Sequence, residues 1–402
     1  MSAVSDAVVS TPHEDFDARA PESWGSAHAD FGRLRATCPV AHTRSFDGFW
    51  VLTKYDDVSE AVRSPETFLT SVQNVVPRVA FTGRRPPLHL DPPEHTPYRS
   101  VLNRFFTQAK VEALRPHIRS SVVDLLRPMI DAGTVDFCED FAHPLPAKVL
   151  ARFFNLPVET AMEIREITRG YTAALNNASD EVVKKASLEL YTVARRMLEE
   201  RKANPLDPAE DPTTALLQAS WQDEPLPEDM ILGTVRQFIV VGMVAPIVFL
   251  GSVAVHLSKH PDVHAQLRAE PELVPAAVQE YLRLFTPYRG FARTANRDII
   301  IRGRLIRKDE PIAVAFASAN RDEEVFAEPD EFILDRPNIG RHLAFGAGPH
   351  RCAGAPLAAE IFEITLEELV GRTTSIELCG EIRMSGWPEI GTLSVPVRLH
   401  SR

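Results

Sequence analysis

The one long apolar run of the chain lies in its middle. No charged residue occurs between Arg236 and Lys259, and positions 238–250 are almost wholly apolar. This run is long enough to cross a membrane, but Gly242 and Pro246 interrupt it, and amphipathic segments flank it on both sides. These features predict a long buried helix and argue against a membrane span.

A second helical pattern begins after Gly354, where apolar residues recur at helical spacing and Pro356 occupies the first turn. This spacing predicts a helix that starts just after Cys352. Unpaired backbone N–H groups and the helix dipole favour a thiolate at such a place, and a thiolate is the form of cysteine that binds a metal ion. The alternative is a buried free cysteine beside a glycine-rich turn.

The rest of the chain reads as mostly helical. Short strands are predicted at 49–52, 299–301, 312–315 and 393–399. Residues 1–27 are expected to form an irregular extension, and residues 28–402 a single domain, because no segment resembles an interdomain linker.

Composition restricts the function class. The 402 residues are 44% hydrophobic and carry a net charge of −11, which allows a large core and argues against nucleic acid or an anionic membrane as a partner. The first ten residues have neither a basic region nor a sustained apolar segment, so no signal peptide is predicted. The cysteines form no CxxC pair or disulfide framework, which predicts a reducing cytoplasm. They are Cys38, Cys138, Cys352 and Cys379.

The segment 345–354, FGAGPHRCAG, resembles the haem-thiolate loop of the cytochrome P450 family. The resemblance extends from about residue 28 to the end. It implies the family's mainly α fold with a small β region, in which haem b lies buried between the long central helix and the cysteine loop. It also implies that Cys352 is the axial iron ligand, whose sulfur pushes electron density toward the iron.

A second family motif is a Glu-x-x-Arg pair that is joined by a later arginine. Glu280 and Arg283 have this spacing, which places both side chains on one helix face, and Arg336 is in the Phe-x-x-x-Arg context. The resemblance implies a buried network of the three. An exposed helical ion pair has the same spacing and is commoner.

Haem has two propionates, which need cationic or hydrogen-bonding partners, and arginine can bind a carboxylate through two hydrogen bonds. Asp91 and Glu94 have the spacing of a capping box that opens a helix before His95. The resemblance assigns cofactor contacts to His95, Arg99, Arg293, Phe345, Gly346, His350 and Gly354, together with Cys352.

The central helix departs from the family. Its catalytic positions are Gly242, Val244, Ala245 and Pro246. The family usually has an acid and a threonine where this chain has Val244 and Ala245, and neither side chain can organise water or transfer a proton. Pro246 has no N–H for the carbonyl of Gly242, which could then hold a water or a polar group of the substrate. The alternative is that Pro246 merely kinks the helix.

By analogy of position, two lids are expected at 71–85 and 171–178, over a mainly apolar pocket that suits a small or medium apolar molecule. Arg84, Arg85 and Arg289 leave room for a substrate carboxylate. The predicted pocket residues are Met243, Val244, Ala245, Gly290, Phe291, Ile390 and Thr392.

The resemblance implies a cytoplasmic monooxygenase that inserts one oxygen atom of O2 into an organic substrate. Electrons would come from a separate ferredoxin and ferredoxin reductase. The alternatives are a peroxide-driven or otherwise atypical P450, and a haem-thiolate protein that senses or carries a ligand without turnover. Candidates for a basic docking face are Arg104, Lys110, Arg115 and Arg351.

Overall fold

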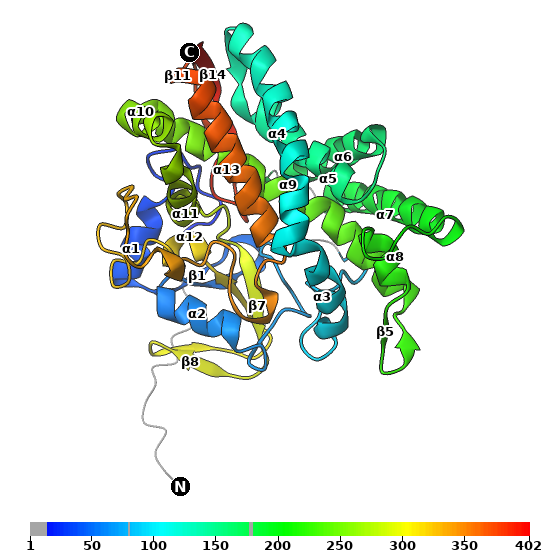
Figure 1. Cartoon of the computed structure of the whole chain (residues 1–402). Helices are drawn as coiled ribbons and strands as arrows, with labels where there is room; N and C mark the ends of the chain where they lie inside the picture. The colour runs from blue at the N-terminus through cyan, green and yellow to red at the C-terminus, as the bar shows by residue number, and fades with distance from the viewer. Residues whose placement is uncertain (1–13, 79–80, 177–179) are drawn as a thin grey trace.

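The computed structural model describes residues 14–78, 81–176 and 180–402. Helices dominate, and the longest of them, α9, crosses the middle of the molecule (Figure 1). The helices are α1 (Ala29–Thr37), α2 (Tyr55–Arg63), α3 (His95–Asn103), α4 (Gln108–Asp131), α5 (Pro144–Phe153), α6 (Val158–Asn176), α7 (Asp180–Ala203), α8 (Pro212–Leu217), α9 (Glu228–Lys259), α10 (Pro261–Ala269), α11 (Val274–Leu284), α12 (Phe316–Ala319) and α13 (Ala355–Arg372).

The strands form small sheets, and the largest has the order β1-β2-β10-β7-β3. It contains β1 (Val40–Thr43), β2 (Phe49–Leu52), β3 (Phe68–Leu69), β7 (Phe291–Ala295) and β10 (Pro311–Val314). A second sheet has the order β11-β14-β4 and contains β4 (Thr134–Asp136), β11 (Thr373–Leu378) and β14 (Pro396–Ser401). The hairpins are β5 (Ser220–Trp221) with β6 (Glu224–Pro225), β8 (Ile299–Ile301) with β9 (Arg304–Ile306), and β12 (Arg383–Met384) with β13 (Thr392–Ser394).

The predicted elements are present with small shifts of their ends. The strands expected at 49–52 and 299–301 are β2 and β8, and the one expected at 312–315 is β10, which begins one residue earlier. The strand expected at 393–399 is divided at Val395 into β13 and β14, which belong to different sheets. The mainly α fold class with a small β region is confirmed.

Helix α9 is a core helix. Among the described residues it is the one helix long and apolar enough to cross a membrane, and 78% of its most apolar window is buried by protein. It contacts α5, α6, α7 and α10. These contacts compensate for Pro246, which removes one backbone hydrogen bond from the helix but does not end it.

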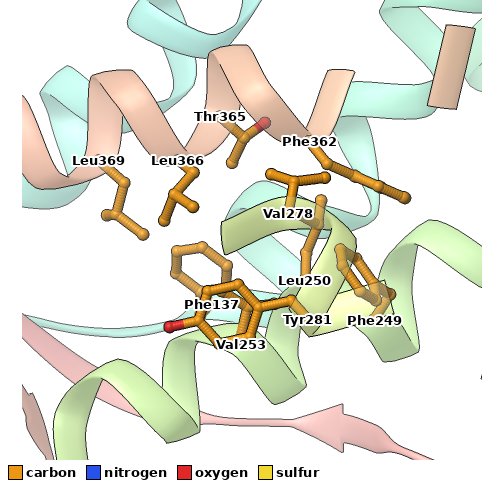
Figure 2. A pocket seen from close by; sticks show the side chains of 10 residues that line it. All are labelled: Phe137, Phe249, Leu250, Val253, Val278, Tyr281, Phe362, Thr365, Leu366 and Leu369. Carbon is orange, nitrogen blue, oxygen red and sulfur yellow. The ribbon is translucent and has the colours of Figure 1, made fainter. Parts of the chain in front are cut away.

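Helices α9, α11 and α13 pack closely where they meet. Figure 2 shows the apolar side chains at this junction, among them Phe249 and Phe362, whose ring centroids lie 4.2 Å apart. The gap between these side chains is about 10 Å³, too small for more than about one water molecule. This junction is therefore solid core, and it fixes α13 relative to α9.

The expected N-terminal extension lies partly outside the described residues. Residues 14–27 contain no helix or strand, but they pack onto the body of the protein. Ala18 and Ala27 are buried, and Phe16 packs against Phe49 and Trp387. Residue 28 therefore marks the start of regular structure and not a boundary of packing.

Candidate functional site

Cys352 lies on a tight loop three residues before α13. The loop is closed by the N–H of Cys352, which donates to the carbonyl of Phe345 at 2.8 Å. Gly346 and Gly348 have φ values of 66° and 67°, which favour glycine. A Cβ on Gly348 would lie 2.2 Å from the carbonyl oxygen of Val62, so this loop can approach α2 only with glycine there.

The Cys352 side chain lies deep among neighbouring segments of the protein but keeps accessible surface. Burial is the main influence on the pKa of its thiol. Burial raises the pKa of the thiol and outweighs the N–H groups of Gly354 and Ala355 and the charges of Arg99 and Arg351, which lower it. The helix N-terminus thus favours the thiolate, as expected from sequence, while burial opposes it.

One face of α9 is also uncovered, although the helix is otherwise buried. Phe238, Val241, Gly242 and Ala245 keep accessible surface, and Val241 is 40% exposed. Their spacing of three and four residues places them on one stripe. The ring centroid of Phe238 lies 6.2 Å from that of Phe106, and a Cβ on Gly354 would lie 3.6 Å from Phe106. This contact places one end of the open stripe beside the cysteine loop.

The family's acid and alcohol positions are occupied by side chains without polar groups. Ala245 is on the open stripe, whereas Val244 is 7% exposed. Gly242 is on the stripe as well, and Pro246 has no N–H to donate to its carbonyl. The polar atoms that α9 offers at this point are therefore those of its backbone.

Four cationic or hydrogen-bonding side chains from three elements meet near the cysteine loop. His95 and Arg99 are on α3, Arg293 is on β7, and His350 is on the loop. The ring centroids of His95 and His350 lie 4.6 Å apart, and Arg99 donates to the carbonyl of Pro349 at 3.4 Å. The four side chains therefore approach one region from different directions.

Burial and neighbouring positive charges disfavour the protonated form of these groups, and Asp91 partly offsets this. Burial lowers the pKa of His350 to about 3, and the charges of Arg293 and His95 lower it further. Burial and Arg99 lower the pKa of His95 to about 4, and burial lowers that of Arg293 to about 10. A buried cluster of this kind is stabilised by anions.

The donor set fits haem. Cys352 offers sulfur, and the four surrounding side chains offer N–H donors for two carboxylates. Nε2 of His95 is buried without a hydrogen-bond partner, and Arg293 has no ion pair among the described residues. Haem carries two propionates, which supply the acceptors that these groups lack.

Asp91 does not form the expected capping box. The N-cap of α3 is Glu94, and no side chain caps this helix. The carboxylate of Asp91 instead accepts hydrogen bonds from the N–H and hydroxyl of Thr70, at 2.9 and 2.8 Å, and from the N–H of Ser71 at 3.1 Å. Thr70 also lies 3.0 Å from Nε2 of His350, so Asp91 joins the start of the predicted lid to the cysteine loop.

Glu280, Arg283 and Arg336 form one buried network. Arg283 donates to both carboxylate oxygens of Glu280, at 2.8 and 2.7 Å, and Nε of Arg336 donates to the same carboxylate at 3.0 and 3.2 Å. Both Glu280 and Arg283 are fully buried, and Arg336 is 4% exposed. The structure therefore contains the buried arrangement and excludes the exposed ion pair for these three residues.

The residues predicted to line the substrate pocket are divided between several places. Ala245 and Phe291 keep accessible surface, whereas Met243 is buried within the core around α9. Gly290 is wedged between two segments, and a Cβ there would lie 2.4 Å from Pro388 and 2.7 Å from the carbonyl of Val76.

The two C-terminal positions of this set lie away from the open stripe. Ile390 borders a cleft of about 800 Å³ beside Trp24 and His256, toward the C-terminal end of α9. Thr392 is fully buried, and its hydroxyl lies 3.7 Å from Sγ of Cys138. Gly290 and Thr392 are therefore packed against other segments and Ile390 borders a different cleft, and a role of these three residues in binding substrate stays a prediction.

Two polar residues near the site were not predicted. Tyr288 keeps accessible surface. Burial raises its pKa, and so do the charges of Glu389, Cys352 and Tyr171. Glu389 forms a backbone bridge with Tyr288. Oε2 of Glu389 is buried without a partner among the described residues, and burial raises the pKa of this carboxyl to about 7. No local sequence pattern marks either residue, because their environment comes from segments distant in sequence.

Comparisons with known proteins agree with this geometry. Residues 45–372 match the family model of cytochrome P450. The chain is 32% identical over 383 residues to mycinamicin IV hydroxylase/epoxidase of Micromonospora griseorubida, covering 92% of this chain and 94% of that protein. It is 32% identical over 378 residues to cytochrome P450 107B1 of Saccharopolyspora erythraea, covering 90% of each.

The fold is also that of solved P450 structures. The structure of cytochrome P450 CYP109Q5 from Chondromyces apiculatus has a TM-score of 0.86 and 27% identity, and the match covers 96% of this chain and 98% of that one. Residues 45–372, which match the family model, include the central helix, the Glu-Arg-Arg network and the cysteine loop. The chain therefore belongs to the cytochrome P450 family and is a haem monooxygenase.

Proposed function

We propose that this P450 inserts one oxygen atom of O2 into a small or medium organic substrate with a mainly apolar body, by hydroxylation or oxidative demethylation. The second oxygen atom leaves as water, with two protons and with two electrons from a separate ferredoxin and its reductase. The protein would act in the cytoplasm and hold haem b through Cys352. When bound, this haem supplies the activation of O2.

The observation that best supports the proposal is the relation between Cys352 and α9. The thiol keeps accessible surface, and so does the open stripe of Val241, Gly242 and Ala245. Basic side chains converge beside the thiol, where they suit the two carboxylates of the cofactor. The apolar stripe leaves a substrate no fixed hydrogen bond near the reacting position except to the backbone of Gly242.

The ligand assignment is tested by the spectrum of the reduced protein under carbon monoxide. The parent should give the red-shifted Soret band of a thiolate-ligated haem. Cys352→Ala should lose this band, and Cys379→Ala, which removes an exposed cysteine, should keep it. A thiolate spectrum in Cys352→Ala would refute the assignment. Product formation with a surrogate ferredoxin, its reductase and NAD(P)H then tests the reaction.

A peroxide-driven reaction is the second candidate, and one observation favours it. Val244 and Ala245 have no group that can transfer a proton. Hydrogen peroxide brings both of its protons with it, so its use depends less on this missing pair. If peroxide supports product formation at a rate equal to or above that of O2 with the surrogate electron donors, the second candidate is the better one.

Ion pairs within the chain neutralise two of the four basic residues that were candidates for docking the electron donor. Lys110 pairs with Glu210, and Arg115 pairs with Glu360. Arg104 and Arg351 are exposed and have no carboxylate partner among the residues that the structure describes. We therefore assign the docking of an acidic ferredoxin mainly to Arg104 and Arg351, and Arg104→Glu should raise the KM for the donor more than it changes kcat.

A further inference from the structure

The buried arginines of the chain can be sorted by their partners. Nine arginines are less than 9% exposed, and six of them pair with a carboxylate. Arg85, Arg236 and Arg293 have no such partner among the described residues. Arg293 belongs to the group that suits the haem propionates. Arg85 and Arg236 remain, two buried cations without an anion.

Arg85 and Arg236 are neighbours because a glycine brings their segments together. A Cβ on Gly233 of α9 would lie 1.9 Å from the carbonyl oxygen of Arg84 and 3.4 Å from Cα of Arg85. Only glycine permits this approach. Arg236 is three residues after Gly233, on the same side of the helix. The loop that ends the first predicted lid is therefore packed directly onto α9 beside Arg236.

The groups around the two guanidinium groups are neutral. Arg236 donates to the hydroxyl of Ser187 at 2.9 Å and to the side-chain oxygen of Gln237 at 3.4 Å. The rings of Tyr171 and Tyr191 lie 5.6 and 5.8 Å from it. The Nε atoms of Arg85 and Arg236 are buried without an acceptor. Unsatisfied charged donors in the interior are costly unless an anion binds to them.

The pKa shifts of Arg236 and His89 indicate a site that favours a bound anion. Burial lowers the pKa of Arg236 to about 10, and Arg85 lowers it further. Burial is the main cause that lowers the pKa of the nearby His89 to about 3, and the charges of Arg85, Arg236 and Arg84 also lower it. Among the described residues, the main groups that act on Arg236 and His89 include no carboxylate.

The cationic pair and the cysteine share a neighbourhood through Tyr288. Tyr171, which lies beside Arg236, and Cys352 both act electrostatically on Tyr288. Arg85 is in the segment 71–85, which was predicted as the first lid and is described except at 79–80. Tyr171 is in the segment 171–178, predicted as the second lid, of which residues 171–176 belong to α6 and 177–178 lie outside the described residues. The pair therefore stands where the loop at Arg85 and the C-terminal part of α6 meet α9.

We propose that Arg85 and Arg236 form a clamp for the carboxylate of an organic acid, which makes the natural substrate of this P450 an anion with an apolar body. The inference rests on the proposed function and specifies its substrate class. Arg84 and Arg289, which sequence also suggested, are not part of the clamp, because Arg84 is exposed and Arg289 pairs with Glu22.

The clamp also determines where the substrate is oxidised. Arg236 precedes Ala245 by nine residues on α9, which is about 14 Å along the helix at 1.5 Å per residue. A carboxylate held by Arg236 is thus distant from Ala245, at the far end of the open stripe. Oxidation falls at the end of the molecule remote from the carboxylate.

The test compares acids with neutral molecules of the same shape on the haem-loaded full chain. Isothermal titration gives Kd for 4-propylbenzoate and 4-propylbenzamide, and for octanoate and octanamide. The parent should bind at least one acid 30-fold or more tightly than its amide. Arg85→Gln should reduce this preference below fivefold by weakening the acid alone. Arg84→Gln, an exposed neighbour on the same loop, should leave both Kd values within twofold.

Thermal stability provides a second readout, which separates a ligand site from a structural role. Without ligand, Arg85→Gln should melt at or above the parent temperature, because it removes a buried like charge. The acid should raise the melting temperature of the parent and not that of the variant. Arg236→Lys keeps the charge but loses the planar fork, and it should weaken acid binding while leaving amide binding unchanged.

Two results overturn the proposal: the absence of an acid preference in both pairs, and an acid preference that Arg85→Gln leaves intact. Binding is measured without turnover, so failure of the clamp and failure of the proposed reaction are distinct. An intact acid preference in a protein without oxidation products would refute the proposed function and leave the clamp standing.

Discussion

Replacement of Glu280 by glutamine should destabilise this protein strongly. The carboxylate of Glu280 accepts hydrogen bonds from Arg283, from Arg336 and from the N–H of Ile333, the last at 3.1 Å. Glutamine keeps the shape but removes the negative charge and one acceptor. Two buried guanidinium groups would then share a dry site with no counter-charge.

The magnitude follows from the burial of the three groups. Removing one partner of a buried ion pair costs about 3–5 kcal/mol, a large share of an ordinary stability of about 5–15 kcal/mol. Arg283 keeps three carbonyl acceptors, on Asn320, Pro329 and Glu331. These bonds hold the side chain in place but do not neutralise it, so the lower end of the range is the minimum expected loss. At about 2 °C per kcal/mol, the melting temperature should fall by at least about 6 °C.

The effect should extend to the cofactor. Arg336 donates to the carbonyl of Ala327, and Asn320, which accepts from Arg283, also binds the N–H of Leu343 at 2.6 Å. The network thus anchors the segment that leads into the cysteine loop. We expect Glu280→Gln to contain less than half of the parent's haem per chain, measured as the pyridine haemochrome.

A matched control is available on α6. Glu163 pairs with Arg196, and the two side chains are 42% and 55% exposed. Glu163→Gln should cost about 0–1 kcal/mol and leave haem content unchanged. If Glu280→Gln melts within 2 °C of the parent and carries full haem, the network does not have the energetic role that its burial implies.

Three further predictions concern α9 and its surroundings. Gly233→Ala should lower the free energy of unfolding by about 1–3 kcal/mol, because its Cβ would lie 1.9 Å from the carbonyl oxygen of Arg84. Gly170→Ala on α6, whose Cβ would have no atom within 4 Å, should raise it by about 0.5–1 kcal/mol. Urea unfolding measures both changes. Glu389 keeps its proton in the folded state up to about pH 7, against an ordinary pKa of 4.5, so stability should fall by about 3 kcal/mol between these pH values. Glu389→Gln should abolish this slope, and an unchanged slope in the variant would mean that another group titrates. Val244→Glu with Ala245→Thr should raise the fraction of electrons recovered in product about twofold or more, measured against peroxide release. Equal coupling in parent and double variant would show that a different proton route operates.

Sequence was a good guide wherever one local pattern determined the outcome. The absence of charge between Arg236 and Lys259 predicted α9, and the loop and helical pattern around Cys352 predicted its position before α13. Prediction from sequence failed where a side chain binds a partner distant in sequence. Asp91 has the local spacing of a cap, but Thr70 and Ser71 supply better-placed donors.

Burial was the other quantity that sequence could not provide. A cysteine before a helix predicts a thiolate, but burial of Cys352 outweighs the helix N–H groups. The local sequence around Arg236 does not distinguish it from an exposed charged residue near the start of an apolar run. Its burial results from α6, α7 and the loop at Arg85, which meet only in three dimensions.

The clamp and the missing acid–alcohol pair bear on each other. A polar group of the substrate could in principle replace the proton donors that Val244 and Ala245 lack. If the carboxylate is held at Arg236, about 14 Å along α9 from Ala245, it cannot reach that position. The proton must then pass through water, for which the backbone carbonyl of Gly242 is the polar atom that α9 offers. Better coupling with acids than with their amides would therefore support both inferences together, whereas tight coupling with neutral amides would contradict the clamp as the determinant of substrate class.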